Sequence, residues 1–153
     1  MANIYKFRQW SLTVLRIVLG IIFTFHGYLK LFVVGGLPGT AQFLSFIGIP
    51  LANYAAVLVA FVEFFGGIFL ILGFLSKWSS AALIIEMLVA LFMVHIRNGF
   101  LIGNGGSEFV LLIIFSLSMI LLNGPGNLSL GRYVFENMKL GSKSRKKKSR
   151  RKR

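Results

Sequence analysis

The sequence of 153 residues contains no cysteine and no aspartate. Without cysteine the chain forms no disulfide and holds no cysteine-ligated iron–sulfur cluster or covalently attached c-type haem. Its four acidic residues are all glutamates, namely Glu63, Glu86, Glu108 and Glu136. The first three lie within or at the edge of an apolar stretch, so they require a chemical explanation.

Hydrophobic residues make up 56% of the chain, and the mean hydropathy is +0.80. They are concentrated in four runs of helix length, at residues 12–32, 54–75, 79–96 and 107–122. A bilayer core about 30 Å thick needs roughly 20 apolar residues per helix. The sequence therefore predicts an all-α integral membrane protein, a four-transmembrane-helix bundle formed by residues 1–138. Too little polar surface remains to solvate four such helices in a soluble protein.

Positive charge is concentrated at the C-terminus, where nine of the eleven residues 143–153 are Lys or Arg. We expect residues 139–153 to form a disordered polybasic tail that attracts anionic lipids, with no specific nucleic-acid recognition because no aromatic residue interleaves it. Lys6, Arg8, Lys77 and this tail fall on one side of a four-span chain. The positive-inside rule then predicts a multi-pass protein of the cell membrane with both termini cytoplasmic.

Ionisable side chains inside a membrane are costly and are therefore candidates for function. At about 100° per residue, one stripe of the first span holds Arg16, Gly20, Phe23, Gly27 and Lys30, with His26 nearby. One face of the second span holds Ala56, Ala60, Glu63, Gly66, Gly67 and Leu70. Small residues beside the charges favour faces that are buried against another helix.

The third span carries Glu86 and His95 about 180° apart, so a straight helix aims only one of them at the bundle interior. The rise of about 1.5 Å per residue gives the depth of each side chain along its span. By this measure we expect a convergence near the outer leaflet of His26, Lys30, His95, Arg97 and Glu108, with Glu63 beneath them. The alternative is structural pairing, such as Lys30 with Glu108 or Arg16 with cytoplasmic headgroups, because long side chains snorkel.

Several short motifs occur in order along residues 16–130. They are Arg16, Gly20, His26-Gly27 and Lys30-Leu31; Glu63, Gly66-Gly67 and Leu72-Gly73; Met87 to Ala90, His95 and Gly99-Phe100; Gly105 and Glu108-Phe109; and Gly124 to Leu130. Together they resemble the DoxX family. The chain departs from the family pattern at Gly131, where members commonly have Asp, and at Glu86, which is not a family position.

The resemblance implies a four-span inner-membrane protein whose relatives are named as oxidoreductases, with links to quinone chemistry, thiosulfate:quinone oxidoreduction and oxidative-stress complexes. A quinone requires an apolar slot, aromatic walls such as Phe23, Phe25, Phe64 and Phe65, and proton donors near its carbonyls. We therefore expect a quinone-interacting subunit that receives electrons from a redox partner protein. The candidate catalytic residues are His26, Glu63, His95 and Glu108, and the candidate substrate-binding residues are Arg16, Lys30, Phe23, Gly27 and Gly67.

Three alternatives remain open from the sequence. A non-enzymatic scaffold, or a proton-coupled transporter of small solutes, would use intramembrane Glu and His residues equally well. A b-type haem held by His26 and His95 is a second alternative. A metal bound by His26, His95 and Glu108 is the third. A homo-oligomer is an alternative to the redox partner.

Overall fold

The computed structural model describes residues 2–131 and 133 of the chain, so the predicted tail at 139–153 lies outside the described residues. The described part is helical, in the order α1 (Ala2–Phe32), α2 (Gly36–Phe46), α3 (Ala52–Leu72), α4 (Ser76–Met93), η1 (His95–Asn98), η2 (Ile102–Asn104) and α5 (Glu108–Asn123). Within it, α1, α3 and α4 are long and apolar enough to cross a membrane, and α5 is a shorter apolar helix. The predicted all-α membrane fold is thereby confirmed.

Two helix boundaries differ from the sequence prediction in an informative way. The segment between the first two predicted spans contains a further helix, α2, which packs on α3 and buries Ala41. The third span was expected to run to residue 96, but α4 ends at Met93 and the chain continues as the 3-10 turn η1. Sharp turns separate α3 from α4, where Gly73 and Leu75 both have positive φ.

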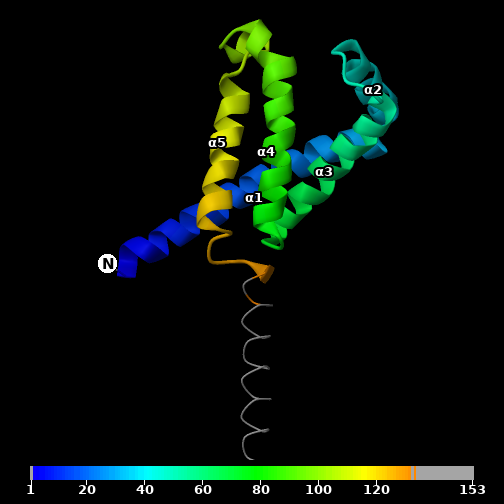
Figure 1. Cartoon of the computed structure of the whole chain (residues 1–153). Coiled ribbons are helices and arrows are strands. Elements are labelled where there is room, and N and C mark those ends of the chain that lie inside the picture. Colours follow the sequence, from blue (N-terminus) through cyan, green and yellow to red (C-terminus); the bar gives the residue numbers. More distant parts are fainter. Residues whose placement is uncertain (1, 132, 134–153) are drawn as a thin grey trace, which may run out of the picture.

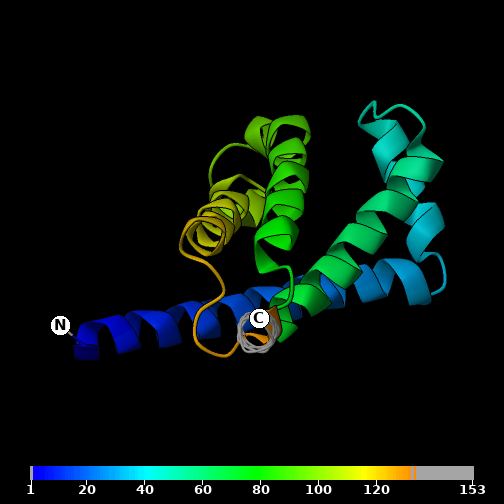
Figure 2. The ribbon, with the colours of Figure 1, turned by 60° about the horizontal axis from the view of Figure 1, so that its bottom comes forward.

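The four long helices form two pairs, α1 with α3 and α4 with α5, and α3 also packs along α4 (Figure 1). The α1 helix is strongly inclined to α4 and α5, which Figure 2 shows from a second direction. One end of the bundle holds α2 and residues 94–107, and we call it the loop end. The opposite end holds the start of α1 and the α3–α4 turn, with Lys6, Arg8 and Lys77, and we call it the basic end.

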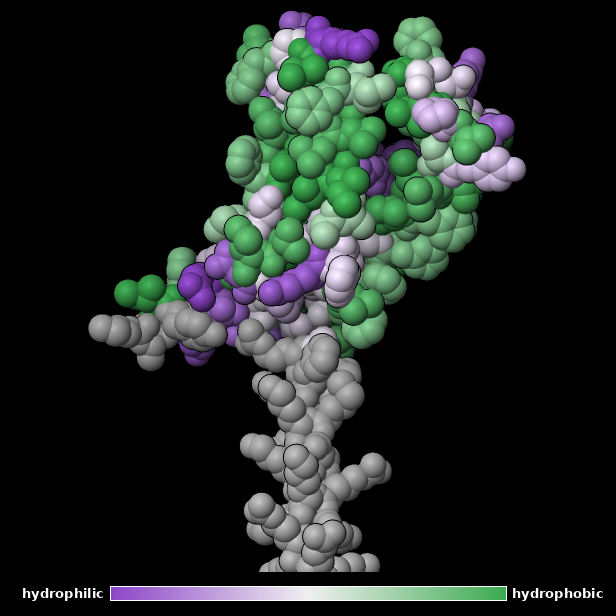
Figure 3. All heavy atoms as spheres, in the orientation of Figure 1, coloured by the Kyte–Doolittle hydropathy of each residue, from purple (hydrophilic) through white to green (hydrophobic). Residues whose placement is uncertain are grey.

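Side chains from all four long helices meet in one apolar core. Its buried members are Leu19, Phe23, Leu70, Leu83, Ile113, Leu117 and Ile120. A smaller cluster of Leu91, Val110 and Ile114 joins α4 to α5 nearer the loop end. The face of the helices drawn in Figure 3 is also largely apolar, and large hydrophobic side chains are exposed on every long helix, as expected for a surface in contact with lipid.

Glycines allow α1 and α3 to approach closely. A Cβ at Gly27 would lie 2.4 Å from the backbone nitrogen of Phe64, and one at Gly67 would lie 2.5 Å from that of Thr24. The predicted faces are confirmed on both helices, since Ala56, Ala60, Glu63, Gly66, Gly67 and Leu70 are the buried residues of α3. This contact of small residues, typical of membrane helices, positions the charged groups described next.

Candidate functional site

An ion pair joins the two most closely packed helices. Lys30 Nζ on α1 donates a hydrogen bond to Glu63 Oε2 on α3. The Glu63 side chain is 6% exposed, whereas that of Lys30 is 23% exposed. Lys30 lies one turn after Gly27, whose contact with the backbone of Phe64 brings the lysine within reach of Glu63. Lys30 therefore pairs with Glu63 and not with Glu108, the partner that the sequence suggested.

Glu86 of α4 is the third member of this cluster. Leu83 of α4 packs against Gly66 of α3, and one turn nearer the loop end this contact places the Glu86 carboxyl group beside Glu63 and within electrostatic reach of Lys30. The Oε2 atom of Glu86 is buried, and no donor among the described residues reaches it. We call Lys30, Glu63 and Glu86 the charge cluster. The sequence left open whether Glu86 or His95 faces the interior, and the structure places Glu86 there.

The charge cluster lies where α1, α3 and α4 meet, on the loop-end side of the four-helix core. On the face drawn in Figure 3, the surface is hollowed between α4 and the part formed by α2 and α3, and hydrophilic atoms lie inside the hollow. This arrangement gives three ionisable side chains an environment of apolar helices in which unpaired charge is costly.

Arg16 has a different environment near the basic end. It is 1% exposed, and its Nη1 atom donates to the carbonyl oxygens of Leu70 and Ile71 at the C-terminal end of α3. Its Nη2 atom donates to the carbonyl oxygen of Leu128, beyond α5. A cation at the C-terminus of a helix is also favoured by the helix dipole. Arg16 thus joins α1, α3 and the segment after α5, and it does not reach lipid headgroups as one alternative predicted.

The segment at 124–131 completes this connection, which we call the Arg16 clasp. Ser129 Oγ donates to the carbonyl oxygen of Gly73 at 2.8 Å. The backbone nitrogen of Asn127 donates to Thr13 Oγ1 at 3.0 Å. The glycine-rich motif after the fourth span is therefore explained by packing, because Gly126 lies against Thr13 where a Cβ would clash. Sequence reasoning identified this motif but did not predict its contact with α1.

His95 and Glu108 organise the turn between α4 and α5. The Nδ1 atom of His95 lies 2.7 Å from the carbonyl oxygen of Gly105. Glu108 Oε1 accepts a hydrogen bond from the backbone nitrogen of Ile102 at 2.6 Å. No group of three His or acidic side chains that could hold a metal occurs among the described residues, so the predicted site of His26, His95 and Glu108 is not formed. Of the residues expected to converge near the outer leaflet, Lys30 and Glu63 form an ion pair, whereas His95 and Glu108 bind backbone atoms of the turn.

The remaining candidate residues are divided between the core and the surface. His26 is exposed, and its ring contacts that of Phe25 with centroids 6.4 Å apart. Phe23 is buried in the core, 2% exposed. An apolar groove of about 310 Å³ between α1 and α3 is lined by Phe25 and Phe64, together with Ile21, Thr24, Tyr28 and Ile71. The expected aromatic walls thus do not surround one slot.

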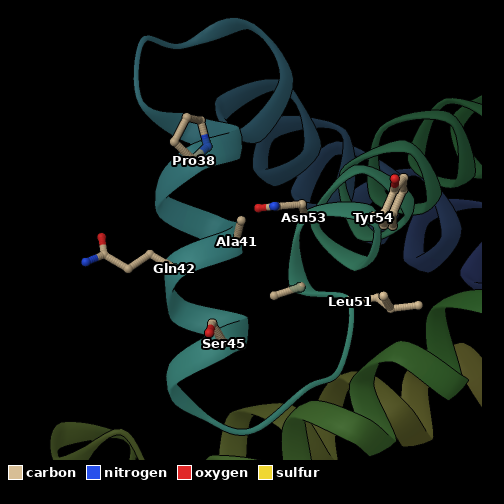
Figure 4. A pocket seen from close by; sticks show the side chains of 8 residues that line it. Pro38, Ala41, Gln42, Ser45, Leu51, Asn53 and Tyr54 are labelled. Carbon is tan, nitrogen blue, oxygen red and sulfur yellow. The ribbon is translucent and has the colours of Figure 1, made fainter.

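A second hollow, of about 520 Å³, lies between α2 and the start of α3 (Figure 4). The Asn53 side chain points across it toward α2, while that of Gln42 points away from α3. Its lining is formed by Pro38, Ala41, Gln42, Ser45, Leu51, Ala52, Asn53 and Tyr54. These groups offer amides and hydroxyls but no carboxylate or ammonium, so the charge cluster remains the better candidate for proton chemistry.

Comparison with known proteins gives consistent results. The DoxX family model matches residues 11–96. "Putative oxidoreductase CatD" from Bacillus subtilis is 30% identical over 130 residues, covering 85% of this chain and 91% of that protein. An uncharacterized protein from Haemophilus influenzae is 31% identical over 150 residues, covering 89% and 99%. "Inner membrane protein YqjF" from Escherichia coli is 29% identical, covering 84% and 95%. No solved structure matches.

Proposed function

Since the chain belongs to the DoxX family of membrane proteins, we propose that it is a quinone-interacting subunit of a membrane oxidoreductase, with the charge cluster as its site. The observation that carries this proposal is the Lys30–Glu63 ion pair, with Glu86 beside it, in the apolar bundle. The name of the Bacillus subtilis relative supports an oxidoreductase role.

The charge cluster has groups suited to the polar ring of a quinone. The Lys30 ammonium can donate a hydrogen bond to a ring carbonyl oxygen, because it has three N–H donors and one hydrogen-bond partner among the described residues. Reduction to the quinol adds two electrons and two protons. In our proposal a reduced partner protein supplies the two electrons, and the two protons reach the ring oxygens from water by way of the charge cluster. Lys30 would then stabilise the negative charge that develops there.

The other candidate residues have supporting roles in this proposal. Gly27 and Gly67 let α1 approach α3 closely enough for Lys30 to reach Glu63, and Phe23 fills the core beneath the cluster. Arg16, His95 and Glu108 bind backbone atoms, so we assign them to the fold. His26 remains a candidate proton carrier at the exposed surface of α1.

Two further parts of the proposal rest on the sequence alone. The basic residues 143–153 would bind anionic lipid at about 1 kcal/mol per charge near the surface. Together with Lys6, Arg8 and Lys77, they would put both termini in the cytoplasm by the positive-inside rule. The redox partner, or a second copy of the chain, would associate with the apolar surface of the bundle.

The proposal is tested by mass spectrometry of an organic-solvent extract from the gently purified protein. We expect a stoichiometric quinone in the wild-type protein and in the control variant Lys77→Gln, because Lys77 is exposed at the basic end. We expect its loss in Lys30→Gln and Glu63→Gln. An extract that contains only phospholipid, or quinone that persists in both cluster variants, would contradict the proposal.

A proton-coupled transporter is the second candidate, and the same cluster favours it. Two carboxyl groups beside one lysine can take up and release a proton without any electron transfer. Proton-dependent solute flux in liposomes without an electron donor would support this function. Loss of that flux in Glu63→Gln would connect it to the cluster.

A further inference from the structure

The charge cluster has an excess of acidic groups. It contains two carboxyl groups, those of Glu63 and Glu86, and one ammonium group, that of Lys30. These are the charged side chains that face Glu86 from α1 and α3, and the described α5 carries no ionisable residue besides Glu108, at its opening in the loop end. With both carboxyls ionised, an uncompensated negative charge would remain among apolar helices, which is energetically costly.

The contact between the two carboxyl groups has a direct chemical requirement. Ionised carboxylates only accept hydrogen bonds, so two of them side by side repel each other unless one carries a proton. Glu63 already accepts from Lys30, and its charge is compensated there. Glu86 has no such cation, and no donor among the described residues reaches its buried Oε2 atom.

From this geometry we infer that Glu86 is a proton-binding residue that holds one exchangeable proton against Glu63, while Lys30 keeps Glu63 charged. This inference rests on the proposed function for the use of the proton, which would pass to a ring oxygen when the quinone is reduced. Glu86 would then release H⁺ to one ring oxygen of the quinone that the partner protein reduces, and it would take up H⁺ from water before the second ring oxygen is protonated. Glu86 was not among the site residues expected from the sequence.

Infrared spectroscopy of the full-length protein in lipid nanodiscs at pH 7 tests the inference directly. We expect a carbonyl stretch from a protonated carboxyl group, which shifts to lower frequency in D₂O because the proton exchanges. The band should be absent in Glu86→Gln and retained in Glu108→Gln. The control is matched, because Glu108 is a glutamate whose carboxylate binds a backbone N–H away from the cluster.

A second variant covers the case in which Glu86→Gln does not fold. Lys30→Met removes the cation that keeps Glu63 charged, so both carboxyls should then carry protons and the band should increase about twofold. The inference is overturned if the wild-type protein has no such band, if the band persists in Glu86→Gln, or if Lys30→Met leaves its intensity unchanged.

The same samples separate this inference from the proposed function. Quinone is extracted and quantified from each nanodisc preparation after its spectrum is recorded. A wild-type protein with the protonated band but without quinone would contradict the proposed function and leave the proton-binding role of Glu86 intact. Bound quinone without the band would support the function and contradict the inference.

Discussion

Among the described residues, ionisable side chains are buried in this membrane bundle at Arg16 and at the charge cluster. Arg16 binds three neutral carbonyl oxygens, on Leu70, Ile71 and Leu128, and it is 1% exposed. Lys30 faces two carboxyl groups and is 23% exposed. The first site has a cation whose partners are parts of the backbone, and the second has more acidic groups than one cation can compensate.

This difference distinguishes a charged side chain that stabilises the fold from charged side chains that can take part in proton chemistry. The Arg16 clasp connects residues 55 and 112 positions apart in the chain and leaves no titratable partner to change state. The charge cluster connects three helices through groups that can gain or lose a proton. Burial alone therefore does not identify a functional ionisable residue, and the chemistry of its partners is the better criterion.

The largest effect is expected from Arg16→Met. The substitution leaves the carbonyl groups of Ile71 and Leu128 without their Arg16 donor, while that of Leu70 keeps the Gly73 N–H, and an unsatisfied buried polar group costs about 1–3 kcal/mol. We expect the free energy of unfolding to fall by about 3 kcal/mol or more. Thermal unfolding in detergent micelles measures this change.

Arg97→Met provides the control, because Arg97 is an exposed arginine at the loop end. Its effect should lie within about 0.5 kcal/mol of zero. If the two variants unfolded at the same temperature, the clasp would not stabilise the fold, and Arg16 would have to be reconsidered as part of the site.

The second effect concerns the glycine contact that positions the charge cluster. Ala is the better helix former, so helix propensity alone would favour Gly→Ala at both Gly27 and Gly39. A Cβ at Gly27 would overlap the Phe64 backbone, whereas one at Gly39 has nothing within 4 Å. We expect Gly27→Ala to lose about 1–3 kcal/mol by overpacking and Gly39→Ala to gain up to about 1 kcal/mol.

The same pair of variants tests the position of Lys30. Separation of α1 from α3 should weaken the ion pair, so Gly27→Ala should also lose bound quinone while Gly39→Ala retains it. Equal stability and equal quinone content in the two variants would show that the close contact is not needed by the cluster.

The sequence predicted much of this framework. The buried faces of α1 and α3 followed from helical periodicity, because glycine, alanine and charged residues recur along one side of each. The partners of the ionisable residues could not be predicted from this periodicity. Helical depth placed His95 and Glu108 beside Lys30, but α4 ends at Met93 and both side chains bind backbone atoms of the turn instead. Helical periodicity determines the face of the helix on which a residue lies. The partner of its side chain depends also on how the helices cross and on where each helix ends.

The third effect separates the stability of the charge cluster from its function. Lys30→Met alone removes the cation beside Glu63, and we expect a loss of about 1–2 kcal/mol, less than for a fully buried pair because Lys30 is partly exposed. The double variant Lys30→Met/Glu63→Leu removes both charges, and its stability should return to within about 1 kcal/mol of wild type. Quinone should be absent from both variants.

A double variant that is stable but binds no quinone would show that the role of the cluster is functional and that the cluster is not needed for stability. If the double variant instead bound quinone normally, the cluster would be a structural feature like the Arg16 clasp. Thermal unfolding and extraction of the same preparations distinguish these outcomes.

The smallest effect is expected from Glu108→Gln, which tests the boundary between the two kinds of site. Glu108 opens α5, where a negative charge near the helix N-terminus contributes about 0.3–1 kcal/mol, and its Oε1 atom accepts from Ile102. Glutamine keeps an acceptor oxygen and loses the charge, so we expect a loss of no more than about 1 kcal/mol with quinone content unchanged. A large loss of quinone without a loss of stability would instead place the loop end within the site, as helical depth alone had indicated. The partner of a carboxylate, here a backbone N–H, would then be a poor guide to its role.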